Sequence, residues 1–117
     1  MLPYKRSERV ADLFREEIAD IILHKVKDPR IGFITVTEVK VSDDLRHARV
    51  YISVLKKEKT QETITVLNSA SGFIRSELGR RVRIKRLPRF EFFEDESIEY
   101  GARIDALLRK LKEESGE

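Results

Sequence analysis

The sequence predicts an α+β fold, in which helices form a layer over a small three-stranded sheet. Three observations support it. Apolar residues recur at three- and four-residue spacing near both ends of the chain and again in its middle, where a glycine interrupts the pattern. Three other segments are rich in β-branched or aromatic residues. With 117 residues, the chain suits one domain with a single core. We expect that domain to span residues 1–117, with residues 112–117 as a frayed tail.

The first predicted element is an amphipathic helix that Ser7 can cap. Its apolar positions fall on one stripe, and charged residues occupy the other side. The stripe consists of Val10, Leu13, Phe14, Ile18, Ile21, Ile22 and Val26. Asp28 precedes Pro29, and a residue before proline is pushed out of the helical region, so the helix ends there.

Two strands follow, over residues 31–41 and 46–55. The second alternates cleanly, which places Ala48, Val50, Ile52 and Val54 on one face. Residues 41–45 between the strands have turn-forming side chains, so we expect an antiparallel hairpin. Residues 56–61 are polar and indicate a surface loop.

The middle of the chain predicts a broken helix. Ile64, Leu67, Ser71, Ile74 and Leu78 share one side, which leaves Asn68, Arg75 and Glu77 facing water, and Gly79 is a plausible stop. A glycine in a helix interior costs about 1 kcal/mol relative to alanine. Gly72 therefore indicates a kink, or two short helices that meet there.

Residues 82–93 predict a third strand, with Val82, Ile84, Phe90 and Phe92 on one phase. Pro88 cannot donate to a ladder, so this strand lies at an edge or bends there. A last helix begins at residues 95–97. We expect its buried side to be formed by Ile98, Ile104, Leu107, Leu108 and Leu111.

Composition and motifs point away from catalysis. The chain has no cysteine, and its two histidines, His24 and His47, have no neighbouring ligand with which to share a metal. Neither a phosphate-binding Gly-x-x-x-x-Gly-Lys loop nor a Gly-x-Ser-x-Gly elbow occurs. Asp95 and Glu96 suit a helix N-terminus without any reaction. We expect no catalytic residue, metal, cofactor, small-molecule substrate or membrane partner, and a cytoplasmic location.

Positive charge is concentrated beside the predicted break. Residues 75–89 carry seven Lys or Arg and one acid, a local net charge of +6 on a chain whose total is +3. Such a cluster is typical of a polyanion site. The candidate RNA-binding residues are Ala70, Ser71, Gly72, Arg75, Arg80, Arg81, Arg83, Lys85, Arg86 and Arg89.

Each half of this candidate site also has a structural explanation. Lys and Arg protect the edge of a sheet against aggregation, although the excess here is large for that purpose. The sequence Ala70-Ser71-Gly72 could simply let two helices pack closely, and the residues alone favour neither explanation of the kink. Among the phenylalanines, Phe90, Phe92 and Phe93 could stack on bases, yet strand alternation places at least two of them in the core.

The predicted order resembles a type II KH fold, an RNA-binding fold with a Gly-x-x-Gly loop. Ala70-Ser71-Gly72 stands where that loop would be, and an Ala-x-Gly kink is similar to the one in the ribosome-binding factor A family. Other landmarks agree in order over roughly residues 6–111. They include Lys27-Asp28-Pro29-Arg30, residues 36–42, Asp44-Leu45-Arg46, Phe73-Ile74-Arg75, Leu87-Pro88 and Asp95-Glu96-Ser97-Ile98.

That resemblance implies a factor that binds the immature small ribosomal subunit and its 16S ribosomal RNA as a monomer. It further implies help with late processing and folding of that RNA, and a link to growth in the cold. The alternative from another class is a protein-interaction module that docks through its charged faces.

Overall fold

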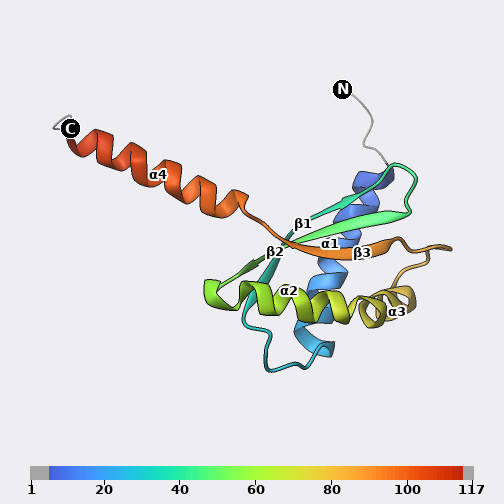
Figure 1. The fold of residues 1–117 in the computed structure, drawn as a ribbon. Coiled ribbons are helices and arrows are strands. Elements are labelled where there is room, and N and C mark those ends of the chain that lie inside the picture. Colours follow the sequence, from blue (N-terminus) through green and yellow to red (C-terminus); the bar gives the residue numbers. More distant parts are fainter. Residues whose placement is uncertain (1–5, 115–117) are drawn as a thin grey trace.

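A computed structural model describes the backbone of residues 6–114, and the side chains of this range apart from 98–100, 102 and 114. The order of helices and strands agrees with the predicted one (Figure 1). The elements are α1 (Arg6–Lys25), β1 (Ile34–Val41), β2 (His47–Val54), the 3-10 helix η1 (Lys57–Lys59), α2 (Thr60–Ser69), α3 (Ser71–Arg81), β3 (Arg89–Glu94) and α4 (Ser97–Glu114).

The three strands form one sheet in the order β1-β2-β3. Strands β1 and β2 are antiparallel, as the predicted hairpin requires, whereas β3 runs parallel to β2 and lies at an edge. A bulge at Thr37 interrupts the β1–β2 register. Since β3 is parallel to its neighbour, a long connection must carry the chain back, and α2 and α3 supply it.

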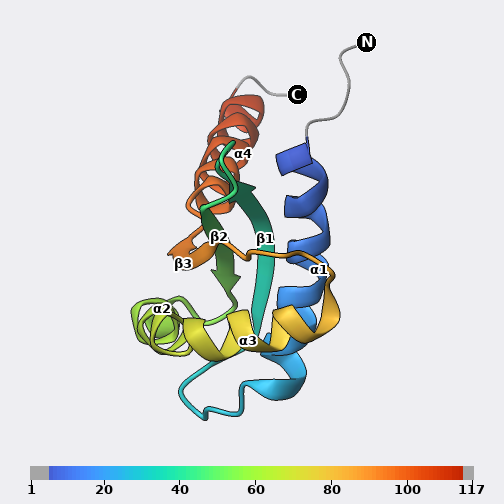
Figure 2. The same cartoon turned by 90° about the vertical axis from the view of Figure 1, so that its right-hand side faces the viewer.

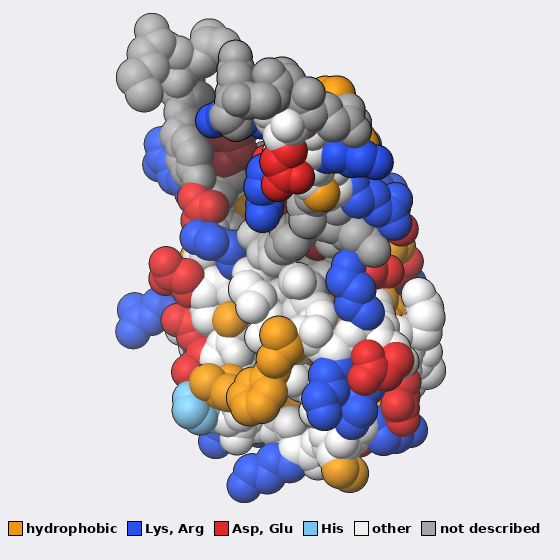
Figure 3. Space-filling view, turned by 90° about the vertical axis from the view of Figure 1, so that its left-hand side faces the viewer, with side chains coloured by type: hydrophobic (Ala, Val, Ile, Leu, Met, Phe, Trp, Pro, Cys, Tyr) orange, Lys and Arg blue, Asp and Glu red, His pale blue; other side chains and the backbone are white. Residues whose placement is uncertain are grey.

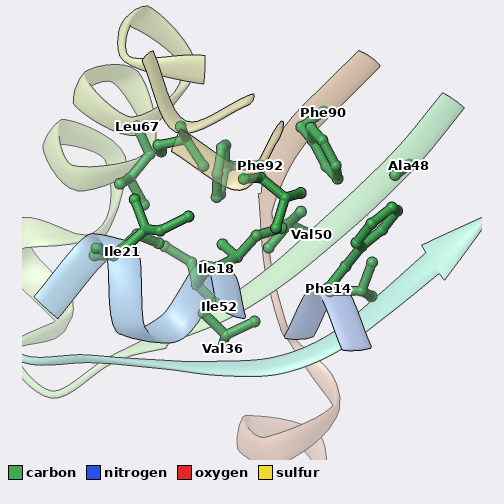
Figure 4. Close-up of a cluster of buried hydrophobic side chains, with 14 of the residues drawn as sticks. Phe14, Ile18, Ile21, Val36, Ala48, Val50, Ile52, Leu67, Phe90 and Phe92 are labelled. Carbon is green, nitrogen blue, oxygen red and sulfur yellow. The ribbon is translucent and has the colours of Figure 1, made fainter. Parts of the chain in front are cut away.

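The core lies between the sheet and helices α1, α2 and α3 (Figure 2). Phe14 of α1 is completely buried and meets Phe90 of β3 edge to face, with ring centroids 5.4 Å apart. Ile18 and Ile21 continue the same buried stripe toward Leu67 of α2 (Figure 4). The inward alternation of β2 is confirmed by four buried side chains: Ala48, Val50, Ile52 and Val54.

The predicted third strand is wrong in its first half, because residues 82–88 are not part of the sheet. The first β2–β3 pair is His47 with Arg89, and β2 begins at His47, so earlier residues have no strand to pair with. We call residues 82–88 the basic loop. Pro88 is buried at its end, directly before the edge strand.

The predicted buried side of the last helix is also wrong. Helix α4 projects from the body of the molecule, as Figure 1 shows, and its apolar residues are exposed: Ile104, Leu107, Leu108 and Leu111. The side chain of Ile98 lies outside the described residues. The helix continues to Glu114, so residues 112–114 are not frayed, and residues 115–117 lie outside the described part of the chain.

Three local predictions also need correction. The expected loop at residues 56–61 contains η1 and the first turn of α2. Gly79 does not stop the helix, which continues to Arg81, and an added Cβ there would lie 3.4 Å from Leu87 Cδ1. Asn68 does not simply face water, because its side chain accepts from Phe92 N at 2.8 Å and donates to Phe92 O at 3.3 Å. It thereby satisfies backbone groups on the outer edge of β3.

A candidate nucleic-acid interface

The helical break and the basic loop lie side by side. Together they line a shallow surface pocket of about 480 Å³. From α3 come Gly72, Arg75, Ser76 and Gly79, and from the basic loop come Ile84, Lys85, Arg86 and Leu87. The tertiary structure therefore brings the kink glycine and three of the predicted cations to one surface.

The break itself is a single non-helical residue. Ala70, with φ −91° and ψ 4°, separates α2 from α3, and its N–H still bonds to Val66 O and Leu67 O. Gly72 follows in the first turn of α3, where a Cβ added to it would meet nothing within 4 Å. Close packing of two helices therefore does not require this glycine. The open space in front of it leaves room for another molecule.

The beginning of α3 also has unused capacity for an anion. The first N–H groups of a helix have no acceptor inside the helix, and the aligned peptide dipoles make that end positive. The N-cap residue is Ala70, which supplies no side-chain acceptor. Backbone N–H groups at a helix N-terminus are suited to bind phosphate.

The basic loop is held against α3 by Arg75. Its guanidinium donates to Leu87 O at 2.8 Å and to Pro88 O at 3.2 Å. Val82 is buried and Ile84 half-buried, so the alternation seen in the sequence persists without a strand. This anchoring leaves three cations of the loop exposed to solvent: Arg83, Lys85 and Arg86.

The remaining predicted cations lie in different environments. Arg81 donates to Glu17 and Asp20 of α1, and its bond to Asp20 lowers the pKa of that carboxyl group. Arg80 is exposed and lies 3.5 Å from Glu77. Arg89 is exposed at the start of β3. Sequence reasoning could not separate these roles, because the carboxylates that engage Arg81 lie more than 60 residues away.

Two carboxylates, those of Asp95 and Asp44, have structural partners. Asp95 accepts from Ser97 N at 2.9 Å and from Thr37 Oγ1 at 2.6 Å. Hydrogen bonds from Ser97 and Thr37 lower the pKa of Asp95, so the carboxylate fixes the start of α4 while charged. Asp44 accepts from Ser42 Oγ and Arg46 N, which fixes the hairpin turn. Neither carboxylate is arranged as a proton donor.

Within residues 6–114, where side chains are described, no group of three or more His, Cys, Asp or Glu could hold a metal ion. In the same part of the chain, no helix is both long and apolar enough to cross a membrane.

An apolar pocket lies at the C-terminal end of α1. Leu23 and Phe33 are 72% and 81% exposed, and they line it together with Ile22, Val26 and Ile31. Figure 3 shows hydrophobic side chains gathered beside a histidine in the lower part of its view. Lys and Arg are interspersed there with Asp and Glu, so this side has no uniform charge.

Comparisons with known proteins agree with the landmarks in the sequence. A family model described as ribosome-binding factor A matches residues 6–108. The chain is 60% identical over 117 residues to the ribosome-binding factor A of Thermodesulfovibrio yellowstonii, which covers 100% of this chain and 99% of that protein.

Solved structures give the same result for the fold. The crystal structure of ribosome-binding factor A from Thermus thermophilus matches with a TM-score of 0.68 and 30% identity, over 75% of this chain and 94% of that one. A homology model of the Thermus thermophilus factor, fitted into a cryo-EM map of a 30S complex, matches with a TM-score of 0.64 and 30% identity. That match covers 74% of this chain and 91% of the other.

Proposed function

Because the chain belongs to the ribosome-binding factor A family, we propose that it binds the immature small ribosomal subunit through 16S ribosomal RNA and assists the late processing and folding of that RNA. The factor acts without catalysis, as a monomer in the cytoplasm. A homology model of the Thermus thermophilus member of the family, fitted into a cryo-EM map of a 30S complex, supports the choice of partner.

One observation carries the choice of site: Gly72, beside the helical break, lines the same pocket as the exposed cations Lys85 and Arg86. RNA backbone approaches Gly72 at the positive end of α3, while Arg83, Lys85 and Arg86 neutralise phosphates on either side. Arg75 and Arg81 have a supporting role, because their guanidinium groups already hold the basic loop and α1. The mechanism is positional, since bound RNA is held in one arrangement while maturation proceeds.

Charge reversal of the basic loop tests the site. The variant Arg83→Glu, Lys85→Glu, Arg86→Glu should lose most binding to small-subunit particles. Each phosphate contact contributes a slope of about −0.7 to −0.9 in log K against log salt, so the slope should become shallower as well. Arg81 is left unchanged, because a glutamate there would face Glu17 and Asp20 and weaken the fold.

A matched control carries the same change in net charge at a distance from the pocket. The variant Lys25→Glu, Lys27→Glu, Lys56→Glu alters three exposed lysines and should bind nearly normally. Equal losses in the two variants would show that only net charge matters, and the proposed site would be rejected.

Gly72 gives a second test, which separates RNA approach from helix packing. Gly72→Ala should keep or slightly raise stability, by up to about 1 kcal/mol, since an alanine Cβ meets no neighbour. Binding to particles should nevertheless weaken, because the Cβ occupies space that the RNA backbone needs. Gly101→Ala in α4 is the control: that glycine is equally open, so its substitution should leave binding unchanged.

The alternative function is a protein-interaction module. The apolar pocket with Leu23 and Phe33 favours it, because exposed apolar patches often mark protein contacts. Capture of small-subunit particles with and without ribonuclease distinguishes the two functions. Capture that survives complete digestion of the RNA would support the protein-binding alternative.

A further inference from the structure

The sheet has a second face, which α1, α2 and α3 do not cover. Side chains of β2 alternate, so the residues between the buried valines and isoleucines point away from the core. On this outer face Tyr51 lies beside Phe93 of β3, and Arg49 lies beside Lys40 of β1. We call this surface, with Arg89 and His47 at its end, the outer sheet face.

Two aromatic rings occupy the centre of the outer sheet face. The Tyr51 and Phe93 rings have centroids 5.8 Å apart and are tilted by 32°. Both side chains are half-buried, unlike Phe90 and Phe92, which the core absorbs completely or nearly so. Such a cross-strand pair stabilises a sheet by a fraction of a kcal/mol, about 0.2 to 1. It also presents two adjacent apolar surfaces on which nucleic-acid bases can stack.

Cations flank the two rings. Lys40 Nζ lies 5.6 Å from the Tyr51 ring centre, and Arg49 Cζ lies 5.9 Å from the Phe93 ring centre. Among the described residues, no carboxylate forms a salt bridge with Lys40, Arg49 or Arg89. The charge of Lys40 also helps to lower the pKa of the nearby Asp95 carboxyl group, whereas Arg49 and Arg89 are available to a ligand that also covers the rings.

The outer sheet face is nevertheless not strongly basic. Glu38 lies beside Tyr51, and Glu91 lies beside Arg49. With Asp95 close to Lys40, three acids face three cations, which gives little net attraction for the dense phosphates of a duplex. Half-buried rings that keep part of their surface in solvent, with cations around them, suit a single strand, whose bases can stack while few phosphates are neutralised.

Position in the chain connects this surface to the basic loop. Arg89 directly follows Leu87 and Pro88, and it is also the first residue of β3 on the outer sheet face. A strand of RNA that passes the basic loop can therefore continue over Arg89 toward Phe93.

We propose that the outer sheet face is a second RNA-binding site, which holds a short single-stranded segment by stacking bases on Tyr51 and Phe93. Lys40, Arg49 and Arg89 contact its phosphates. This site lies outside the kink and the basic loop, and the proposal rests on the proposed function only in that RNA is the partner.

The test uses the full chain and a fluorescein-labelled, unstructured RNA of about ten nucleotides, a length within the range bound by single-strand sites. Fluorescence anisotropy gives the affinity for this RNA. Tyr51→Val and Phe93→Val keep a strand-forming side chain but remove a ring, and each should weaken binding about tenfold. Tyr51→Phe keeps the ring and should bind like the unchanged chain. Circular dichroism verifies the fold of each variant.

Wild-type affinity in both valine variants would overturn the proposal, since the rings would then have only a structural role. A second outcome is that the valine variants keep the oligonucleotide but lose a capture of particles that, in the unchanged chain, survives ribonuclease treatment. That result would assign the face to a protein partner and would also overturn the proposal.

The charge-reversed basic loop separates this proposal from the proposed function. If that variant still binds particles normally while the valine variants lose the oligonucleotide, the kink site fails and the outer sheet face stands. If the charge-reversed variant loses particle binding while the valine variants keep the oligonucleotide, the kink site stands and the outer sheet face fails.

Discussion

Helices α1 and α4 have similar spacing of apolar residues, but most of the apolar face of α1 is buried and that of α4 is exposed to solvent. Both are amphipathic, with 20 and 18 residues and apolar positions at helical spacing. In α1 the residues Phe14, Ile18 and Ile21 have no exposed surface, whereas in α4 the exposed fraction of Leu107 is 57% and that of Leu111 is 61%. Periodicity therefore specifies which face of a helix is apolar, but not what covers that face.

The difference arises from how each helix is tethered to the sheet. Helix α1 packs on β1 and is tied to α3 by Arg81. Helix α4 begins at Ser97, two residues after Asp95, whose N–H bonds to Ile52 O and whose carboxylate accepts from Thr37. These bonds fix the direction in which the chain leaves β3, and that direction carries α4 away from the body (Figure 1).

The largest expected effect comes from the buried face of α1. Phe14→Ala removes a ring that packs against Phe90 and leaves a cavity, so the free energy of unfolding should fall by about 3 to 5 kcal/mol. Urea unfolding followed by circular dichroism measures the loss. Leu13→Ala in the same helix is the control, because Leu13 is 41% exposed and should cost much less. Similar losses in the two variants would contradict the assigned face.

A smaller loss should follow when the tie between α1 and α3 is removed. Arg81→Gln breaks the bonds to Glu17 and Asp20, and its unfolding midpoint should fall by less than that of Phe14→Ala. Exposed ion pairs are screened by salt, so the difference from the unchanged chain should shrink at about 1 M salt. A difference that does not depend on salt would indicate lost packing rather than lost charge.

The segment after α1 should respond to acid. Asp28 accepts from the Arg30 side chain and backbone, which lowers the pKa of Asp28 to about 2. A lowered pKa means that the stabilisation is complete above the ordinary range near pH 4 and is lost as pH falls through about 2. Asp28→Asn should therefore be less stable than the unchanged chain at neutral pH, and the difference should disappear only below about pH 2. A constant difference across that range would show that the charge of Asp28 is not the cause.

The smallest effect is expected in α4. Leu107→Ser with Leu111→Ser should change the free energy of unfolding by no more than about 0.5 kcal/mol, since both side chains are already in water. Thermal unfolding of the two-site variant beside the unchanged chain measures it. A loss of about 2 kcal/mol or more, the range of a core truncation, would mean that this face of α4 is covered in solution.

The basic segment illustrates how far prediction from sequence reached. The prediction that Val82 and Ile84 share one phase is confirmed, because Val82 is buried and Ile84 half-buried while Arg83 between them is exposed. The same alternation also predicted a strand, which was wrong. A strand needs a neighbour to pair with, and β2 begins only at His47, the partner of Arg89, so residues 82–88 have none. Local pattern cannot report whether a partner strand exists.

The candidate site shows the same limit among residues of one type. The sequence grouped seven cations around the kink, and the structure places Arg75, Lys85 and Arg86 with Gly72. It directs Arg81 to Glu17 and Asp20 instead, through contacts between residues far apart in the chain. Whether these residues bind RNA stays a prediction, to be decided by the charge-reversed variants.

By itself, the sequence determined the order of the helices and strands, the inward face of β2, that of α1 apart from Leu13, which is exposed, and the concentration of positive charge beside a helical break. Those features depend on neighbours within a few residues, where spacing and side-chain type suffice. Only the tertiary structure decided that α4 stays uncovered, that Tyr51 and Phe93 meet on the outer sheet face, and that Gly72 opens onto the basic loop. Each of these depends on the spatial placement of distant segments, which is set by packing of the whole core rather than by any local pattern.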